Sequence, residues 1–113
     1  MKTITTDQLK QSREKKENLT LVNTLAPDAF EKTRIPGAVN VPLEASDFAK
    51  RVEQEAGGKD EPVVVYCASQ QCNSSEKAAL KLKEAGFTDV KRYTGGAAAW
   101  TKEVEEVEVG PAC

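Results

Sequence analysis

PVVVY, residues 62–66, is the stretch that decides the fold class of this 113-residue chain. Three consecutive valines favour a β-strand that is covered on both faces, as the strands of parallel sheets are. Shorter β-prone segments lie on either side of it along the chain, at Thr3–Thr5, Leu19–Val22 and Val90–Tyr93. Helical segments alternate with these strands, and this alternation predicts an α/β domain with a largely parallel sheet.

Four helices are predicted between and after the strands. Thr5 or Thr6 offers the N-cap of a polar helix near the amino terminus, and Gln8 lies where a capping box would place it. Residues 45–56 are amphipathic, and residues 74–85 carry alanine and leucine side chains at helical spacing. A short helix around Trp100 follows the last strand, and we expect its indole in the core.

The remaining segments are predicted as turns, an edge strand and a tail. Asn23–Asp28 is turn-prone, and Gly95 and Gly96 are predicted as turn glycines with unusual backbone angles. Arg34–Pro42 holds a brief strand between two prolines, which suits the edge of a sheet. Glu103–Glu108 alternates acids with valines, and we interpret it as a solvated edge or a frayed end.

Composition and charge favour one globular domain over residues 1–113. Hydrophobic residues make up 39% of the chain and charged residues 30%, a mixture typical of folded proteins. The net charge of −2 and the absence of a basic patch predict no nucleic-acid partner. No apolar run approaches the roughly 20 residues of a membrane span, and Met1–Gln11 lacks the apolar centre of a secretory signal. We therefore expect a cytoplasmic protein without a membrane partner.

The absence of histidine limits the chemistry that this chain can perform. Hydrolases that use imidazole as a base, and zinc sites with histidine ligands, are excluded. The chain has three cysteines, Cys67, Cys72 and Cys113, an odd count that does not suggest a disulfide framework. No second cysteine pair has the spacing of metal ligands, so we expect neither a metal nor a cofactor.

The loop after the central strand is the predicted reactive site. The strand ends at Cys67, and before the next helix come Ala68, Ser69, Gln70, Gln71, Cys72 and Asn73. In open α/β sheets, ligands bind beyond the carboxyl ends of the strands. Loop amides and the dipole of the following helix favour a thiolate there without any histidine. We therefore predict that Cys67 lies at the mouth of the loop, where it takes up sulfane sulfur that the amides bind.

Four segments connect the chain to a known family. Residues 35–42 read IPGAVNVP, residues 63–67 VVVYC, residues 78–87 AALKLKEAGF and residues 95–100 GGAAAW. In these segments the chain resembles the rhodanese homology family over nearly its whole length. The resemblance implies a five-stranded, mainly parallel central sheet flanked by helices on both faces. It also implies a sulfurtransferase with Cys67 as the sulfur-accepting cysteine: a thiosulfate- or polysulfide-type donor loads a persulfide, and cyanide or a thiol unloads it.

Several positions depart from the pattern of that family. Residues 23–25 read NTL where an Asp-x-Arg motif is common, and Arg34 replaces a frequent histidine. Arg34 is either a surface charge or a replacement contact for an anion. No lysine or arginine lies between Cys67 and Glu76, which argues against the dianion thiosulfate as the physiological donor.

Cys72 has two interpretations. It is either a packing residue or a resolving thiol that attacks the persulfide on Cys67, releases sulfide and leaves a disulfide. The second interpretation requires the two Cα atoms to lie within roughly 7 Å. It would give the protein a thioredoxin-like reductant as partner, beside a small sulfur donor and a thiol acceptor. Cys113 is expected to be an exposed thiol without a role.

Two further hypotheses belong to other functional classes. The altered residues 23–25 favour a catalytically inactive rhodanese fold that serves as a binding or regulatory module. A dithiol redox protein would instead use Cys67 and Cys72. A phosphatase or arsenate reductase is not expected. Such an enzyme would need an arginine at position 73 to bind two phosphoryl oxygens at once, and this chain has Asn73 there.

Overall fold

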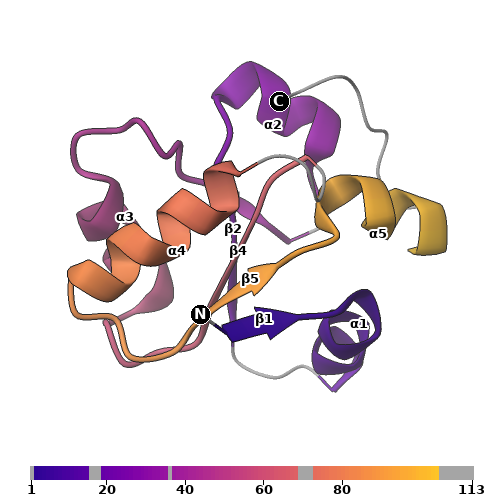
Figure 1. Cartoon of the computed structure of the whole chain (residues 1–113), viewed down its shortest axis with the longest axis horizontal. Coiled ribbons are helices and arrows are strands. Elements are labelled where there is room, and N and C mark those ends of the chain that lie inside the picture. The colour runs from indigo at the N-terminus through magenta and orange to yellow at the C-terminus, as the bar shows by residue number, and fades with distance from the viewer. Residues whose placement is uncertain (1, 16–18, 36, 69–72, 105–113) are drawn as a thin grey trace.

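The computed structural model of the chain describes residues 2–15, 19–35, 37–68 and 73–104, and it contains one five-stranded sheet with helices on both faces (Figure 1). The strands are β1 (Lys2–Ile4), β2 (Thr20–Asn23), β3 (Val39–Asn40), β4 (Val63–Tyr66) and β5 (Val90–Tyr93). The helices are α1 (Thr6–Glu14), α2 (Pro27–Thr33), α3 (Phe48–Ala56), α4 (Ser74–Glu84) and α5 (Gly96–Val104). The strand order is β1-β5-β4-β2-β3, and every pair is parallel. The predicted fold class is confirmed.

The valine-rich strand lies at the centre of the sheet. All four residues of β4 are buried, and β4 pairs with β2 on one side and with β5 on the other. In this register Val65 lies between Val22 and Arg92. Helices cover both faces, so each side chain of β4 enters a core whichever way it points.

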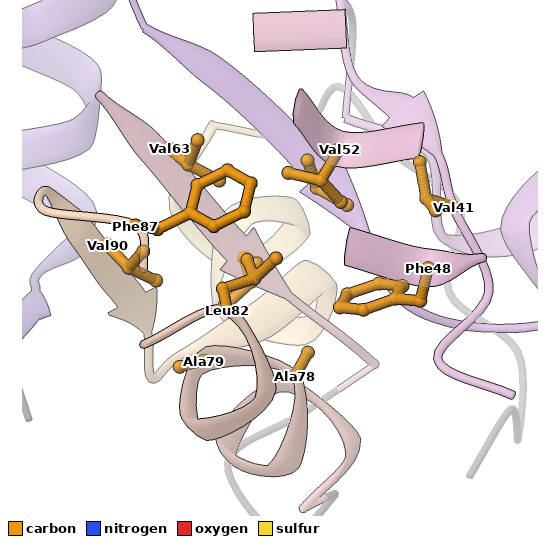
Figure 2. Close-up of a cluster of buried hydrophobic side chains, with 11 residues drawn as sticks. Val41, Phe48, Val52, Val63, Ala78, Ala79, Leu82, Phe87 and Val90 are labelled. Carbon is orange, nitrogen blue, oxygen red and sulfur yellow. The ribbon is translucent and has the colours of Figure 1, made fainter. Parts of the chain in front are cut away.

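One core lies between the sheet and the helices α3 and α4 (Figure 2). Val63 and Val65 of β4 meet Phe48 of α3 and Leu82 of α4 there. Phe87, just after α4, returns to the same core, as the left-handed Gly86 before it allows. Each of these large side chains stabilises the fold by about 1.5–3 kcal/mol when it is fully buried.

A second core lies on the opposite face, under α1 and α5. Val64 and Tyr66 of β4 point into it and meet Leu9 of α1 and Trp100 of α5. The Trp100 ring packs edge-on against Tyr93, with centroids 6.5 Å apart, and is buried as the sequence predicted. The two cores together use alternate residues of the same strand, which is why four consecutive residues are all apolar.

The ends of several elements confirm the sequence signals, and one helix was missed. Thr5 caps α1, with its side chain and that of Gln8 forming the predicted capping box. The brief strand β3 lies at the edge of the sheet, as expected. Helix α3 begins at Phe48 rather than at Ala45. Helix α2 was not predicted, because its N-cap is Ala26, which offers no capping side chain.

The two adjacent glycines before α5 have different roles. Gly96 has a φ of 64°, in agreement with the unusual backbone angle that was predicted for it. Gly95 does not have a positive φ. The constraint on Gly95 is space, because a Cβ there would lie 2.6 Å from the Cβ of Ala99.

Within the described residues, none of the helices has both the length and the apolar composition that a membrane span requires.

Candidate functional site

Cys67 directly follows the last residue of the central strand β4. Its side chain is buried, with 1% of its surface exposed. It forms a small cluster with Leu25, which follows β2, and with Ala68, and Ala29 of α2 packs against this cluster. From the sequence we predicted Cys67 at the mouth of the loop, and the structure instead covers its side chain with apolar side chains from the end of β2 and from α2.

The polar contact of the Cys67 sulfur comes from the start of helix α4. The Sγ atom of Cys67 donates a hydrogen bond to Ser75 Oγ at 3.5 Å. Ser75 is itself buried, with 1% exposure, in the first turn of α4. The N-cap of this helix is Asn73, so Ser75 lies inside the first turn. The Ser75 hydroxyl is therefore directed to the sulfur.

A cationic side chain reaches the same serine from β5. Arg92 Nε donates a hydrogen bond to Ser75 Oγ at 2.9 Å. Arg92 pairs with Val65 in the sheet, and neighbouring residues of adjacent strands point to the same face. Because Cys67 lies two residues beyond Val65, its side chain also turns toward the face that α4 covers. The structure thus brings Cys67, Ser75 and Arg92 into one hydrogen-bonded series.

Sequence reasoning missed Arg92 because it considered basic residues only in the loop after Cys67 and at Arg34. A basic residue in the loop would be near the sulfur by chain connectivity, whereas Arg92 is near it through the pairing of β4 with β5. One signal was present. A charged residue inside a short core strand needs a polar partner, because arginine is rarely buried unpaired.

Helix α5 fixes the backbone at the beginning of the loop. The amide of Ala97 donates to the carbonyl oxygen of Cys67 at 2.9 Å, and the amide of Ala98 donates to that of Ala68 at 2.8 Å. Both donors belong to the first turn of α5, whose amides have no partner within the helix. The position of Cys67 is therefore set by a segment 30 residues further along the chain.

The altered residues at the end of β2 build a buried polar network beside Cys67. Asn23 Oδ1 accepts a hydrogen bond from the Leu25 amide at 2.9 Å, and Asn23 Nδ2 donates to Thr33 Oγ1 at 3.0 Å. Thr24 Oγ1 donates to the Tyr66 carbonyl oxygen at 3.3 Å. Asn23 and Thr24 thus hold Leu25 against the sulfur. In this chain, residues 23–25 have a structural role at the site.

The Tyr66 side chain lies at the same end of β4 but on the opposite face of the sheet. Its hydroxyl accepts a hydrogen bond from the Ile35 amide at 3.0 Å and donates one to the Thr33 carbonyl oxygen at 3.1 Å. Burial raises the pKa of Tyr66 above its usual 10.0, and the hydrogen bonds at its oxygen offset only part of that rise. The residue therefore connects the end of α2 to the central strand as a neutral phenol.

The other predicted site residues are placed elsewhere or lie outside the described structure. Arg34 is exposed, and its guanidinium lies over the Phe30 ring, 5.5 Å from the centroid, so its role as an anion contact stays a prediction. Asn73 is exposed. Outside the described residues lie Ser69, Gln70, Gln71, Cys72 and Cys113. Within the described part of the chain, no group of histidine, cysteine and carboxylate side chains could hold a metal ion.

Comparison with known proteins gives consistent matches along most of the chain. The model of the rhodanese-like domain matches residues 5–103. Thiosulfate sulfurtransferase GlpE of Pseudomonas syringae is 34% identical over 87 residues, which are 76% of this chain and 76% of that protein. Putative sulfur carrier protein YrkF of Bacillus subtilis is 29% identical over 102 residues. The chain spans 52% of YrkF and 40% and 21% of two further relatives.

Solved structures agree with these sequence matches. The BH2092 protein of Bacillus halodurans has a TM-score of 0.78 and 30% identity, covering 96% of this chain and 77% of that one. A rhodanese-like domain protein of Staphylococcus aureus has a TM-score of 0.76 and 25% identity, covering 97% of this chain and 99% of that one. The parallel sheet with helices on both faces is thus shared over nearly all of the chain.

Proposed function

The chain belongs to the rhodanese-like domain family, and from that premise we propose that it is a sulfurtransferase that carries sulfane sulfur as a persulfide on Cys67. The family resemblance inferred from four sequence segments is confirmed. The observation that carries the proposal is the hydrogen bond of the Cys67 sulfur to a serine that also binds an arginine. Ser75 thus connects a cationic side chain to the sulfur at the end of the central strand.

The first half of the proposed reaction loads the cysteine. The Cys67 thiolate attacks the outer sulfur of a donor such as thiosulfate or a polysulfide. A new S–S bond forms on Cys67 while the S–S bond of the donor breaks. Sulfite, or a polysulfide shortened by one sulfur, leaves with the electron pair of the broken bond. The product on the protein is a persulfide anion, and no outside oxidant or reductant is consumed.

The second half returns the cysteine to its starting state. A thiolate or cyanide attacks the terminal sulfur of the persulfide, and the Cys67 thiolate leaves with the bonding pair. The acceptor becomes a persulfide or thiocyanate. Small partners suit this step, because Cys67 is buried and has little surface for a bulky reagent. We therefore propose a small sulfur donor and a small thiol or cyanide acceptor as partners.

Mass spectrometry tests the proposal directly. The protein is incubated with polysulfide and, separately, with thiosulfate, and the intact mass and the Cys67 peptide are measured. We expect a gain of one sulfur atom, about 32 Da, on Cys67, and its loss on treatment with a thiol. Cys67→Ser is the matched control and should gain nothing at this peptide. Absence of the adduct with every donor would contradict the proposal.

One observation favours a second function. The 1% exposure of Cys67 is what a structural cysteine would show, and it supports the alternative of an inactive rhodanese fold that binds a partner. A Cys67 that stays unmodified, in a protein that remains folded, would favour this module. The resolving-thiol role of Cys72, with a thioredoxin-like reductant, remains a further proposal. It predicts a disulfide-containing Cys67 peptide after persulfide loading, which Cys72→Ser abolishes.

A further inference from the structure

We propose that Arg92 is a positioning residue for the Cys67 sulfur, acting through Ser75, and that it supplies the positive charge which the loop after Cys67 lacks. The inference rests on the proposed sulfur transfer and names the group that stabilises its anionic sulfur. It revises the expectation from sequence that thiosulfate is disfavoured, since a guanidinium near the sulfur attracts a dianionic donor.

The sheet register brings Arg92 to the sulfur. Arg92 pairs with Val65, two residues before Cys67, and its side chain extends over the same face of the sheet toward the start of α4. There its Nε meets Ser75 Oγ at 2.9 Å, and the Cys67 sulfur lies 3.5 Å from the same oxygen. Because both hydrogen bonds share one oxygen atom, the charge and the sulfur are separated by a single hydroxyl group.

The hydrogen atoms that each side chain can donate determine the direction of the hydrogen bonds between Arg92, Ser75 and Cys67. A serine hydroxyl has one hydrogen to donate and lone pairs that accept, whereas a guanidinium only donates. Arg92 therefore occupies a lone pair of Ser75 Oγ. With a neutral Cys67, the thiol hydrogen can use another lone pair. When Cys67 loses its proton, the Ser75 hydrogen can turn to the sulfur, so the anion keeps a hydrogen bond and gains the attraction of the nearby charge.

The surrounding charges do not replace that of Arg92. Around the sulfur, the apolar neighbours are Leu25, Ala29 and Ala68. The charged residues next to these contacts, Asp28 on α2 and Glu76 and Lys77 on α4, are all exposed, where water screens them. Arg92 is half-buried, and its hydrogen bond to Ser75 lies away from full solvent exposure. Its charge therefore acts on the sulfur with less screening than theirs.

The neighbouring residue of β5 provides a matched control. Lys91 carries the same charge one residue earlier, but its strand neighbours are Lys2 and Val64. Val64 belongs to the core on the opposite face. The Lys91 amino group lies 3.9 Å from an Asp89 carboxylate oxygen. Lys91→Gln thus removes a positive charge from the same strand without touching the Cys67–Ser75–Arg92 series.

The first experiment measures the sulfur anion without requiring sulfur transfer. In a Cys72→Ser, Cys113→Ser background, thiolate absorbance is followed against pH, with the Cys67→Ser protein subtracted. For Arg92→Gln we expect the midpoint to move up by about one pH unit, equivalent to about tenfold less thiolate at pH values below both midpoints. Lys91→Gln should leave the midpoint in place. Arg92→Lys, which keeps charge and donor, should recover most of the shift.

A second experiment separates local charge from a change in structure. Cys67 is alkylated with anionic iodoacetate and with neutral iodoacetamide in the same background. Arg92→Gln should lower the iodoacetate-to-iodoacetamide rate ratio severalfold, because the guanidinium attracts the anion. Ser75→Ala keeps the guanidinium and should lower both rates while preserving most of the ratio. This variant also tests the series if Arg92→Gln fails to fold.

The outcomes distinguish this inference from the proposed function. An unchanged midpoint in Arg92→Gln and Ser75→Ala, or an equal shift in Lys91→Gln, would overturn the role of Arg92. Absence of a persulfide on Cys67, with the midpoint shifted as expected, would overturn the transferase and leave the positioning role intact. If both hold, Arg92→Gln should raise the KM for thiosulfate more than the KM for a neutral sulfur donor.

Discussion

At the scale of single residues, buried polar groups around the end of β4 form hydrogen bonds with one another. Tyr66 is the clearest case, because its buried hydroxyl both accepts from the Ile35 amide and donates to the Thr33 carbonyl oxygen. Removing that oxygen leaves two buried backbone groups without this partner. A buried group that loses its hydrogen bond costs about 1–3 kcal/mol.

Tyr66→Phe should therefore destabilise the protein near neutral pH by about 1–3 kcal/mol, measured by urea unfolding. It should also weaken the loss of stability in alkali. Above pH 10.0 the unfolded chain releases the Tyr66 proton, while the folded chain, whose pKa is raised by burial, keeps it. The unfolded state then binds fewer protons, so stability falls as pH rises through this window. Equal alkaline slopes in the two proteins would refute this account.

At the scale of elements, the start of α5 determines the backbone of the loop. The amides of Ala97 and Ala98 hold the carbonyl oxygens of Cys67 and Ala68, and Gly95 lets the chain approach Ala99 closely enough to place those amides. An added methyl group at Gly95 would lie 2.6 Å from the Ala99 Cβ and 3.3 Å from the Tyr93 hydroxyl. The first turn of α5 would have to shift.

Gly95→Ala should destabilise the fold by about 1–3 kcal/mol, as overpacking does, and should slow persulfide formation on Cys67. The second-site change Ala99→Gly removes the clashing methyl group. In the double variant we expect part of the lost stability to return, beyond the sum of the single effects, when thermal unfolding is compared in a double-mutant cycle. Strict additivity would show that the two positions do not conflict.

Sequence patterns correctly predicted those features of the elements that depend only on residues close together in the chain. The valines of β4 and the Thr5 cap of α1 follow from local periodicity and capping chemistry, and both were correct. Helix α2 was missed because Ala26 gives no capping signal. The contact of Arg92 with Ser75 could not be read from spacing, because it exists only once β5 has paired with β4.

At the scale of the whole molecule, the central strand separates two cores and leads directly into Cys67. Helices α3 and α4 cover one face and α1 and α5 the other (Figure 1). Cys67 has hydrogen bonds to Ser75 of α4 and Ala97 of α5, one helix from each face, and the cluster around its side chain includes Ala29 of α2. The burial of its side chain is a property of this arrangement and not of the cysteine alone.

This burial predicts selectivity by size. In the background without Cys72 and Cys113, Cys67 should react with a bulky aromatic disulfide at least about tenfold more slowly than an unfolded control, because local opening must come first. The reaction rate with small sulfur donors should fall by a smaller factor in the native protein. The measurement is the rate of thiol consumption in native buffer and in urea. Equal native rates for bulky and small reagents, relative to urea, would contradict the buried position.

The site around Cys67 is assembled from parts of the chain that lie far apart in the sequence and are synthesised one after another. Cys67 and Leu25 come early, but Ser75, Arg92 and the amides of Ala97 and Ala98 follow later. A nascent chain that stops short of residue 92 has neither the cation nor the α5 amides at its cysteine. During translation the thiol therefore lacks these contacts, and the proposed sulfur transfer can begin only after residues 92–98 have been synthesised and have folded against it.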